Sequence, residues 1–158
     1  MTDFSDGWVY YDQTKKYYRT MGEELDWANA RRSCQQLCLK GDLASIKDDA
    51  TMKFIRDNVP LTVNEKEYFV WIGAQKQNGY WRWSDGTTWN YENWAFTPPS
   101  YTSSFSGINI FLHRANFRWY AERYYYNNNF LCQCDVATGE INIQSHPPEI
   151  LPWHWTCP

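Results

Sequence analysis

The chain has 158 residues, of which 43% are hydrophobic and 21% charged, so it has the size and composition of one globular domain rather than of a disordered or low-complexity segment. Its formal net charge is −3 and its basic residues form no long block, which argues against binding to a nucleic-acid backbone. No apolar run reaches the roughly 20 residues of a membrane-spanning helix, and residues 1–10 lack the basic and apolar regions of a signal peptide.

Both predicted helices lie in the first sixty residues. A hairpin over residues 7–19 comes first, because two aromatic runs flank a polar turn. Residues 26–38 then place apolar side chains three and four positions apart, which predicts an amphipathic helix that stops before Gly41. Residues 43–46 follow as a short apolar strand. Residues 47–58 form the second helix, which Pro60 prevents from continuing.

The rest of the chain is predicted to be strand and loop. Tight turns and apolar or aromatic runs predict strands at residues 68–73, 80–83, 108–113, 118–126 and 130–134. Residues 95–107 form an irregular loop, and residues 127–129, three asparagines, are expected to form a turn because asparagine tolerates left-handed backbone angles. Residues 136–158 contain four prolines and no periodicity. We therefore expect one domain over 1–135 and a C-terminal extension or linker over 136–158.

Aromatic residues are abundant, with 10 tryptophans, 12 tyrosines and 8 phenylalanines making up 19% of the chain. Such side chains supply large buried areas together with polar tips, so they suit both cores and binding surfaces. This composition is typical of compact β-rich domains with irregular loops.

The cysteines form two close pairs and one isolated residue: Cys34, Cys38, Cys132, Cys134 and Cys157. A four-thiolate zinc site is disfavoured, because the single residue between the third and fourth cysteines is shorter than the usual gap. A helix would place the first pair on one face about 6 Å apart, and a strand would place the second pair about 6.6 Å apart. Two parallel disulfides between helix and strand, formed in an oxidising compartment, are therefore favoured, with the individual pairing left open.

Six groups of residues occur in an order and spacing that resemble a C-type lectin-like domain from about Gly7 to Cys134. They are the opening hairpin with Gly7-Trp8 and Tyr17-Tyr18, Trp27-x2-Ala30-x3-Cys34, the stretch Gly41 to Ile46, Trp71-Ile72-Gly73, the stretch Trp83 to Thr87 with Tyr91 to Trp94, and Trp119 thirteen residues before Cys132. The resemblance implies an α+β fold in which two helices flank small antiparallel sheets and a long irregular loop projects.

The resemblance also bears on the cysteine pairs. It implies a bridge between Cys34 and Cys132, the family's outer disulfide. The family's inner disulfide would join a strand near Asn109 to position 124, where this chain has Tyr124 and no cysteine. Cys38 and Cys134 look like a substitute for that second bridge.

In sugar-binding members of the family, a Glu-Pro-Asn or Gln-Pro-Asp triplet and an Asn-Asp pair hold one calcium ion, which in turn holds two sugar hydroxyls. Calcium takes six to eight oxygen ligands, so these carboxylates and amides are needed. At the corresponding positions this chain has Pro98-Pro99-Ser100 and Tyr120-Ala121. The resemblance therefore predicts no metal and no calcium-dependent sugar binding.

The sequence contains no motif of a hydrolase, metalloprotease or phosphate-binding enzyme, so we expect neither catalysis nor a cofactor. The predicted function is a calcium-independent extracellular recognition module that binds a protein through the long loop and the strand after Trp119. Alternation would put Arg118 and Tyr120 on one face of that strand, opposite a buried Trp119. The candidate ligand-binding residues are Tyr101, Phe105, Arg118, Tyr120, Arg123 and Tyr125.

Two other functions stay open at this point. One is carbohydrate binding without metal, by stacking of aromatic rings on sugar faces. The other is a spacer role in a multi-domain endocytic receptor, because Trp155-Thr156-Cys157-Pro158 resembles the start of the next domain in mannose-receptor-family proteins. In that case Cys157 pairs outside this sequence; in a single-domain protein it would be free or intermolecular. In either case the location is extracellular or the ectodomain of a cell-surface protein.

Overall fold

The computed structural model describes residues 7–61, 69–96, 108–122 and 127–135. The helices are α1 (Trp27–Leu37) and α2 (Asp49–Asn58). The strands are β1 (Val9–Tyr11), β2 (Lys16–Leu25), β3 (Asp42–Leu43), β4 (Phe69–Gln77), β5 (Tyr80–Trp83), β6 (Ile108–His113), β7 (Trp119–Glu122) and β8 (Asn128–Asp135). The α+β class expected from the sequence is confirmed. The strand expected over residues 43–46 is shorter than predicted and ends at Leu43.

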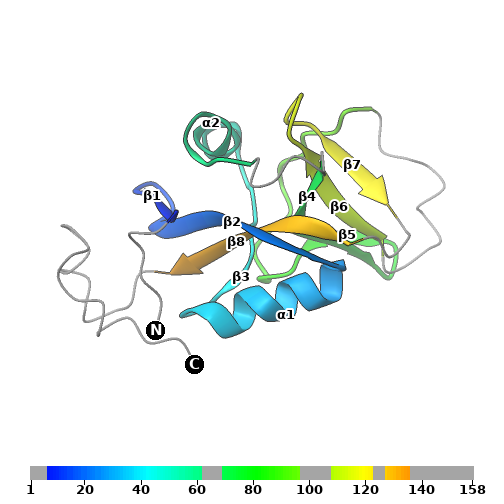
Figure 1. The fold of residues 1–158 in the computed structure, drawn as a ribbon. Coiled ribbons are helices and arrows are strands. Elements are labelled where there is room, and N and C mark those ends of the chain that lie inside the picture. Colours follow the sequence, from blue (N-terminus) through cyan, green and yellow to red (C-terminus); the bar gives the residue numbers. More distant parts are fainter. Residues whose placement is uncertain (1–6, 62–68, 97–107, 123–126, 136–158) are drawn as a thin grey trace, which may run out of the picture.

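The strands form one mixed sheet in the order β1-β2-β8-β4-β6-β7, with β3 added to β8 and β5 added to β4. Every pair is antiparallel except β4 and β8, which run parallel through Val70 opposite Asn129 and Trp71 opposite Phe130. This short parallel contact joins the strands into a single sheet, where the resemblance implied separate small ones. Figure 1 shows α1 and α2 on opposite sides of the β2–β8 pair.

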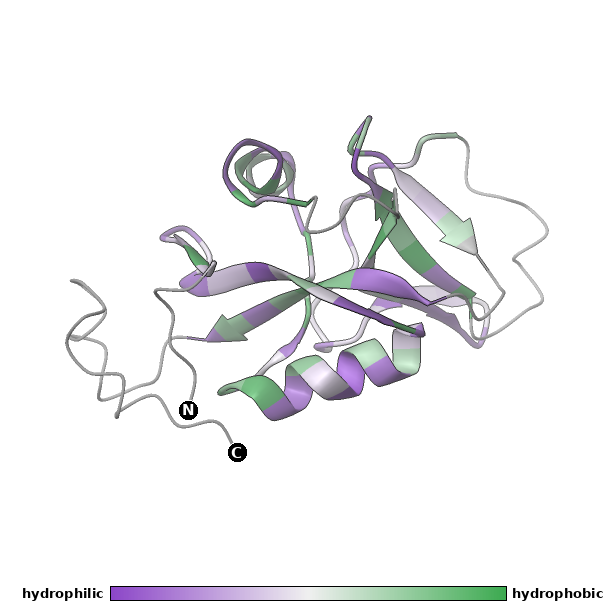
Figure 2. Cartoon of the chain, in the orientation of Figure 1, coloured by the Kyte–Doolittle hydropathy of each residue, from purple (hydrophilic) through white to green (hydrophobic). Residues whose placement is uncertain are grey.

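Each helix begins at an aspartate that caps its first turn. Asp26 accepts a hydrogen bond from the backbone N–H of Asn29 at 2.8 Å, and Asp48 accepts one from Thr51 at 2.7 Å. These side chains satisfy N–H groups that have no partner inside the helix. Hydrophobic and hydrophilic residues alternate along both helices in Figure 2, as the amphipathic patterns predicted.

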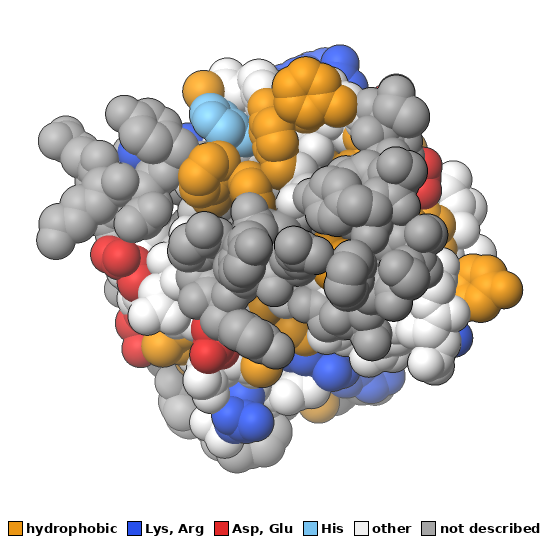
Figure 3. Space-filling model, turned by 90° about the vertical axis from the view of Figure 1, so that its right-hand side faces the viewer, with side chains coloured by type: hydrophobic (Ala, Val, Ile, Leu, Met, Phe, Trp, Pro, Cys, Tyr) orange, Lys and Arg blue, Asp and Glu red, His pale blue; other side chains and the backbone are white. Residues whose placement is uncertain are grey.

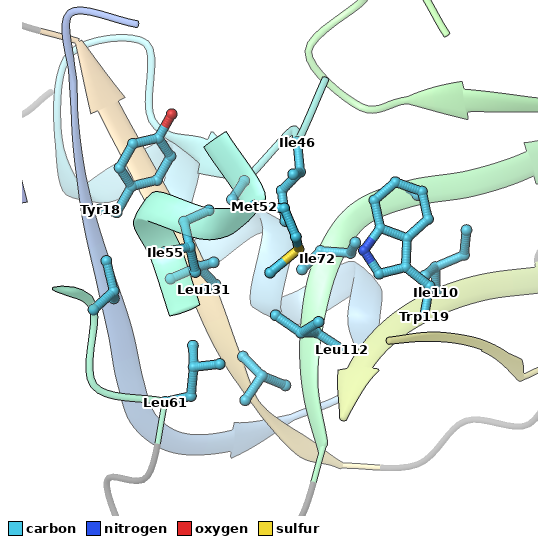
Figure 4. Close-up of a cluster of buried hydrophobic side chains, with 14 of the residues drawn as sticks. Tyr18, Ile46, Met52, Ile55, Leu61, Ile72, Ile110, Leu112, Trp119 and Leu131 are labelled. Atoms are coloured by element: carbon cyan, nitrogen blue, oxygen red, sulfur yellow. The ribbon is translucent and has the colours of Figure 1, made fainter. Parts of the chain in front are cut away.

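The sheet carries a hydrophobic cluster on each face. The cluster under α2 is drawn in Figure 4 and includes Tyr18, Ile55, Ile72, Leu112 and Trp119, all at most 1% exposed. The cluster under α1 contains both cysteine pairs and the other side of the sheet, including Trp27, Trp71 and Phe130. The tryptophans at positions 27, 71 and 119 therefore build the core, and the burial expected for Trp119 is confirmed.

Strand β8 is bonded covalently to α1. Disulfides join Cys34 to Cys132 and Cys38 to Cys134, with Cα–Cα distances of 5.5 and 5.9 Å. All four residues are at most 2% exposed. Because these sulfurs are bonded to one another, they are not available as zinc ligands.

The turn expected at the three asparagines is wrong for two of them, because Asn128 and Asn129 are buried residues of β8. The register between β2 and β8 shifts between Met21 and Leu25, which takes backbone carbonyls of β2 out of the regular ladder. The side-chain amide of Asn129 donates to two of these carbonyls, those of Gly22 at 3.0 Å and Glu23 at 3.1 Å. Asparagine is thus placed here by its hydrogen-bonding capacity and not by its turn propensity.

A buried polar network holds β8 to the chain that follows β5. The carboxylate of Asp85 accepts hydrogen bonds from Ser45 Oγ at 2.6 Å, Gln133 Nε2 at 3.0 Å and the backbone N–H of Thr87 at 3.0 Å. Burial by itself would raise the pKa of Asp85, but these hydrogen bonds outweigh burial and lower the pKa below its ordinary value of 3.8. The ionised carboxylate therefore stabilises the folded state.

The two disulfides should act non-additively. Each closes a loop of nearly the same length, with sequence separations of 98 and 96 residues, so either one alone supplies most of the constraint on the unfolded chain. We expect the variant with all four cysteines replaced by alanine to lose about 4 to 5 kcal/mol of chain entropy stabilisation. Each variant lacking one bridge should lose far less than half of that, as measured by urea unfolding. Losses that simply add would contradict this account.

The Asp85 network should make stability depend on pH. A lowered pKa in the folded state means that the stabilisation is present at neutral pH and is lost as the pH falls below the ordinary value of 3.8. Asp85→Asn should cost about 1 to 2 kcal/mol at pH 7 and flatten the acid limb of the stability curve. Asp12→Asn is the matched control, because Asp12 forms only an exposed ion pair with Lys15 and should change stability little.

Candidate functional site

On the α1 side of the sheet, β4, β6 and β7 carry a row of aromatic side chains that continues the buried cluster under α1 towards the surface. Strand pairing sets Phe69 opposite His113, Trp71 opposite Phe111, and Phe111 opposite Tyr120. Alternate residues of a strand project to the same face, so the three strands bring their rings together. We call Phe69, Phe96, Phe111, His113 and Tyr120 the aromatic face.

The rings of the aromatic face touch one another in sequence. Tyr120 stacks on Phe111 with ring centroids 5.6 Å apart and planes at 7°, and Phe69 lies 4.3 Å from Phe111. Phe96 meets Tyr120 edge to face at 5.9 Å. Exposure rises along this row, from 8% at Phe111 to 74% at Phe96. Figure 3 shows hydrophobic side chains gathered beside a histidine on this side of the molecule.

Phe96 reaches this face because Trp119 anchors the chain that precedes it. Trp94 forms a bridge with Trp119, and the backbone N–H of Ala95 donates to the Trp119 carbonyl at 3.0 Å. On the inner face the Trp119 indole is only 1% exposed. It contacts four further rings, those of Trp83, Trp89, Tyr91 and Trp94. A tightly packed tryptophan therefore holds Phe96 beside Tyr120.

Arg118 lies on a different part of the surface from Tyr120. It precedes the first residue of β7, and its guanidinium Nη1 donates to Asn93 Oδ1 at 2.7 Å on the side of α2. Phe117 has a left-handed φ of 59°, so the backbone before β7 is not extended and strand alternation does not apply there. The structure gives Arg118 and Tyr120 different neighbours, and the expected single face containing both is not formed.

Four of the predicted ligand-binding residues lie outside the described residues: Tyr101, Phe105, Arg123 and Tyr125. Phe96 and Phe111 are not among the residues predicted from the sequence. Phe111 alternates with His113 in a strand whose pairing was unknown, and Phe96 stands at the start of a loop. The two-residue period of the strand was visible in the sequence. It predicts a surface only when the neighbouring strands are also known.

The arm that would hold calcium after Trp119 is Tyr120-Ala121 in β7. The Tyr120 hydroxyl accepts a hydrogen bond from Asn116 Nδ2 at 2.9 Å, and Ala121 has no side-chain oxygen. Within the described ranges no three His, Cys, Asp or Glu side chains lie close enough together to hold a metal ion. The other arm, at residues 98–100, lies outside the described residues.

The fold and its two disulfides define a class of protein. The family profile described as "Lectin C-type domain" matches residues 23–134, so the chain belongs to this family. The resemblance drawn from the motifs is confirmed. Neither described helix has the length and apolarity needed to cross a membrane.

Named relatives include a snaclec and a mannose receptor. Snaclec A10 from Macrovipera lebetinus is 34% identical over 98 residues, which cover 58% of this chain and 62% of the snaclec. C-type mannose receptor 2 from Mus musculus is 25% identical over 146 residues, which cover 91% of this chain and 10% of the receptor. The chain thus spans about three-fifths of the first relative and a tenth of the second.

Solved structures show the same fold. Human lithostathine superimposes with a TM-score of 0.70 at 23% identity, covering 82% of this chain and 89% of its own. A calcium-independent type II antifreeze protein superimposes with a TM-score of 0.64 at 24% identity, covering 81% of this chain and 91% of its own. At these identities the likeness speaks for the fold alone.

The aromatic face should contain residues that stabilise the fold, such as Phe111, and exposed residues that do not, such as Phe96. Phe111→Ala should destabilise the domain by about 3 to 5 kcal/mol, because a large buried ring is removed. Phe96→Ala should change the free energy of unfolding by less than about 0.5 kcal/mol, because its ring is mostly in water. Chemical denaturation of the two variants beside the wild type measures this difference. A large loss in Phe96→Ala would show that the rim is part of the core.

Proposed function

We propose that this domain is a calcium-independent extracellular recognition module that binds a protein partner through the aromatic face, with the long loop and the strand after Trp119 completing the contact. The observation that carries the proposal is the stacked pair of Phe111 and Tyr120 with Phe96, 74% exposed, at its edge. The Tyr120-Ala121 segment puts an aromatic ring where sugar-binding relatives need oxygen ligands for calcium.

The physical support is that these rings are held in place before any partner arrives. Tyr120 is fixed by Phe111 beneath it and by the hydrogen bond from Asn116, so little side-chain entropy is lost on binding. Aromatic side chains are enriched among the residues that dominate binding energy at protein interfaces. A rigid, partly exposed aromatic cluster therefore suits direct contact with a protein surface.

The extracellular location is supported by the two disulfides, which persist in oxidising compartments. The relatives support the recognition role. One is by name a receptor, C-type mannose receptor 2. Since this chain matches only 10% of that receptor, a spacer role inside a larger endocytic receptor is an alternative reading.

A second surface supports carbohydrate as an alternative ligand. A hollow of about 280 Å³ is lined by residues of β5 and the chain after it, including Tyr80, Trp81, Arg82 and Trp89. Tyr80 is 70% exposed, and the rings of Trp81 and Trp89 are stacked 6.1 Å apart. Aromatic rings beside an arginine suit stacking and hydrogen bonding to a sugar without a metal.

The test is binding of the 158-residue chain to panels of extracellular proteins and of neutral and sulfated glycans, each with calcium and with a chelator. We expect a protein partner whose binding is unchanged by the chelator. Phe96→Ala and Tyr120→Ala should weaken it by about 2 kcal/mol each, the loss typical of a central aromatic contact.

The matched control is Tyr80→Ala, which removes an equally exposed ring from the other hollow and should leave protein binding unchanged. Binding that disappears in chelator would overturn calcium independence. Glycan binding that is lost only in Tyr80→Ala would favour the carbohydrate reading. A folded chain that binds neither panel would favour the spacer role.

A further inference from the structure

A second hollow, of about 290 Å³, lies between α2 and the turn that joins β6 to β7. Its lining combines three cations with polar side chains, notably Lys53, Arg56, Tyr91, Asn93, Asn116 and Arg118. We call it the basic hollow. Its volume is at the lower end of ligand pockets, so it suits one side chain rather than an extended ligand.

The charge of the basic hollow comes from one face of α2 and from Arg118. Asp49, Lys53 and Arg56 are spaced four and three residues apart and therefore share a helix face. Asp49 is the one carboxylate among the described lining residues, and its Oδ1 already accepts a hydrogen bond from the Tyr91 hydroxyl at 2.6 Å. The lining thus keeps an excess of positive charge.

Arg118 is the least compensated of these cations. Its guanidinium has five N–H donors, and within the part of the chain that the structure describes one of them is used, by Asn93 Oδ1 at 2.7 Å. It forms no ion pair with any other described residue. A planar guanidinium with unused donors matches a carboxylate in a bidentate arrangement.

Lys53 and Arg56 are held by a competitor just outside the hollow. Both donate to Asp57, Lys53 at 2.5 Å and Arg56 at 3.2 Å. The hydrogen bonds from Lys53 and Arg56 lower the pKa of Asp57, so it stays ionised. These pairs are exposed and weak, with 42% of the Asp57 side chain in contact with water, so an incoming anion can exchange with them.

Asn116 connects the basic hollow to the aromatic face. Its Oδ1 accepts a hydrogen bond from the backbone N–H of Arg118 at 2.9 Å, and its Nδ2 donates to the Tyr120 hydroxyl at 2.9 Å. One asparagine therefore lines the hollow and holds the outward tyrosine. The basic hollow and the aromatic face therefore meet at Asn116.

We propose that the basic hollow binds the carboxylate of a glutamate or aspartate side chain presented by the protein partner, with Arg118 as its main ligand and Lys53 and Arg56 as supporting charges. This inference rests on the proposed function, since it names the charged group of the same partner. The hollow adds charge selection to the apolar contact made by the aromatic face.

The probe is N-acetyl-glutamate methylamide, titrated into the full chain at low salt and followed by NMR of the side-chain N–H groups of Asn93, Asn116 and Arg118. The uncharged glutamine analogue is the paired ligand. We expect saturable shifts for the glutamate probe only, weakened by rising salt. Arg118→Gln should weaken binding at least about tenfold, the effect of losing a charge-assisted contact. Arg118→Lys keeps the positive charge but loses the planar guanidinium, so its affinity for the probe should lie between those of the wild type and Arg118→Gln.

Two further variants fix the interpretation. Arg32→Gln is the matched control, because Arg32 also donates to a single asparagine, Asn29 Oδ1 at 2.7 Å, and does not line the hollow; its binding should equal that of the wild type. Asp57→Asn removes the competitor, so it should tighten binding about two- to threefold. A gain of binding in this variant is not explained by damage to the fold.

Three outcomes would each overturn the proposal. They are equal shifts with the glutamine analogue, equal losses of probe affinity in Arg118→Gln and Arg32→Gln, and no gain of probe affinity in Asp57→Asn. A sulfated disaccharide that shifts these three groups while the glutamate probe does not would also overturn it. The proposed function is tested separately: Phe96→Ala should weaken partner binding about thirtyfold and leave probe binding intact. If partner binding is unchanged in Arg118→Gln, the basic hollow fails while the aromatic face stands.

Discussion

The fold depends on β8 being held on every side. It pairs with β2, β3 and β4, and two disulfides bind it to α1. Seven of its eight residues are buried. Because β8 is the last of the described strands and pairs with three strands from earlier in the chain, its docking joins them into one sheet. On the edge of β8 opposite β2, β4 makes the short parallel contact at Asn129 and Phe130.

In β7, the strand after the β6–β7 turn, neighbouring residues have different roles: one packs in the core and the next contributes to the surface. Trp119 points into the core and is surrounded by rings, and Tyr120, one residue later, points outward onto Phe111. The alternation of a strand allows one short segment both to anchor the fold and to present a surface. Trp94 and Ala95 run beside it, which brings Phe96 to the edge of that surface.

The two surfaces around β7 complement each other in chemistry. The aromatic face offers large apolar rings that gain free energy when covered, and the basic hollow offers charges that select an anion. Apolar burial supplies affinity, whereas charge complementarity supplies specificity and orientation. Within the described residues no three His, Cys, Asp or Glu side chains lie close enough to hold a metal ion, and Trp119 is followed by Tyr120-Ala121 in a domain of the C-type lectin family.

Much of this architecture was predictable from the sequence because it rests on local chemistry. The periods of three and four residues predicted α1 and α2, and the spacing of the family motifs predicted the class of fold and the buried tryptophans. The residues 128 and 129 were mispredicted as a turn because the need for asparagine arises from a shifted register in β2, some hundred residues away.

The candidate site, like the fold, was only partly predictable from the sequence. Tyr120 and Arg118 were identified from the sequence by their place beside Trp119, but in the structure Arg118 precedes the first residue of β7 and contacts Asn93, whereas Tyr120 lies in β7 and stacks on Phe111. The aromatic face exists only once β4, β6 and β7 are paired, and the basic hollow only once α2 packs beside their turn. Residue periods determine which side chains share one face of an element, whereas the meeting of faces from different elements is determined by tertiary packing.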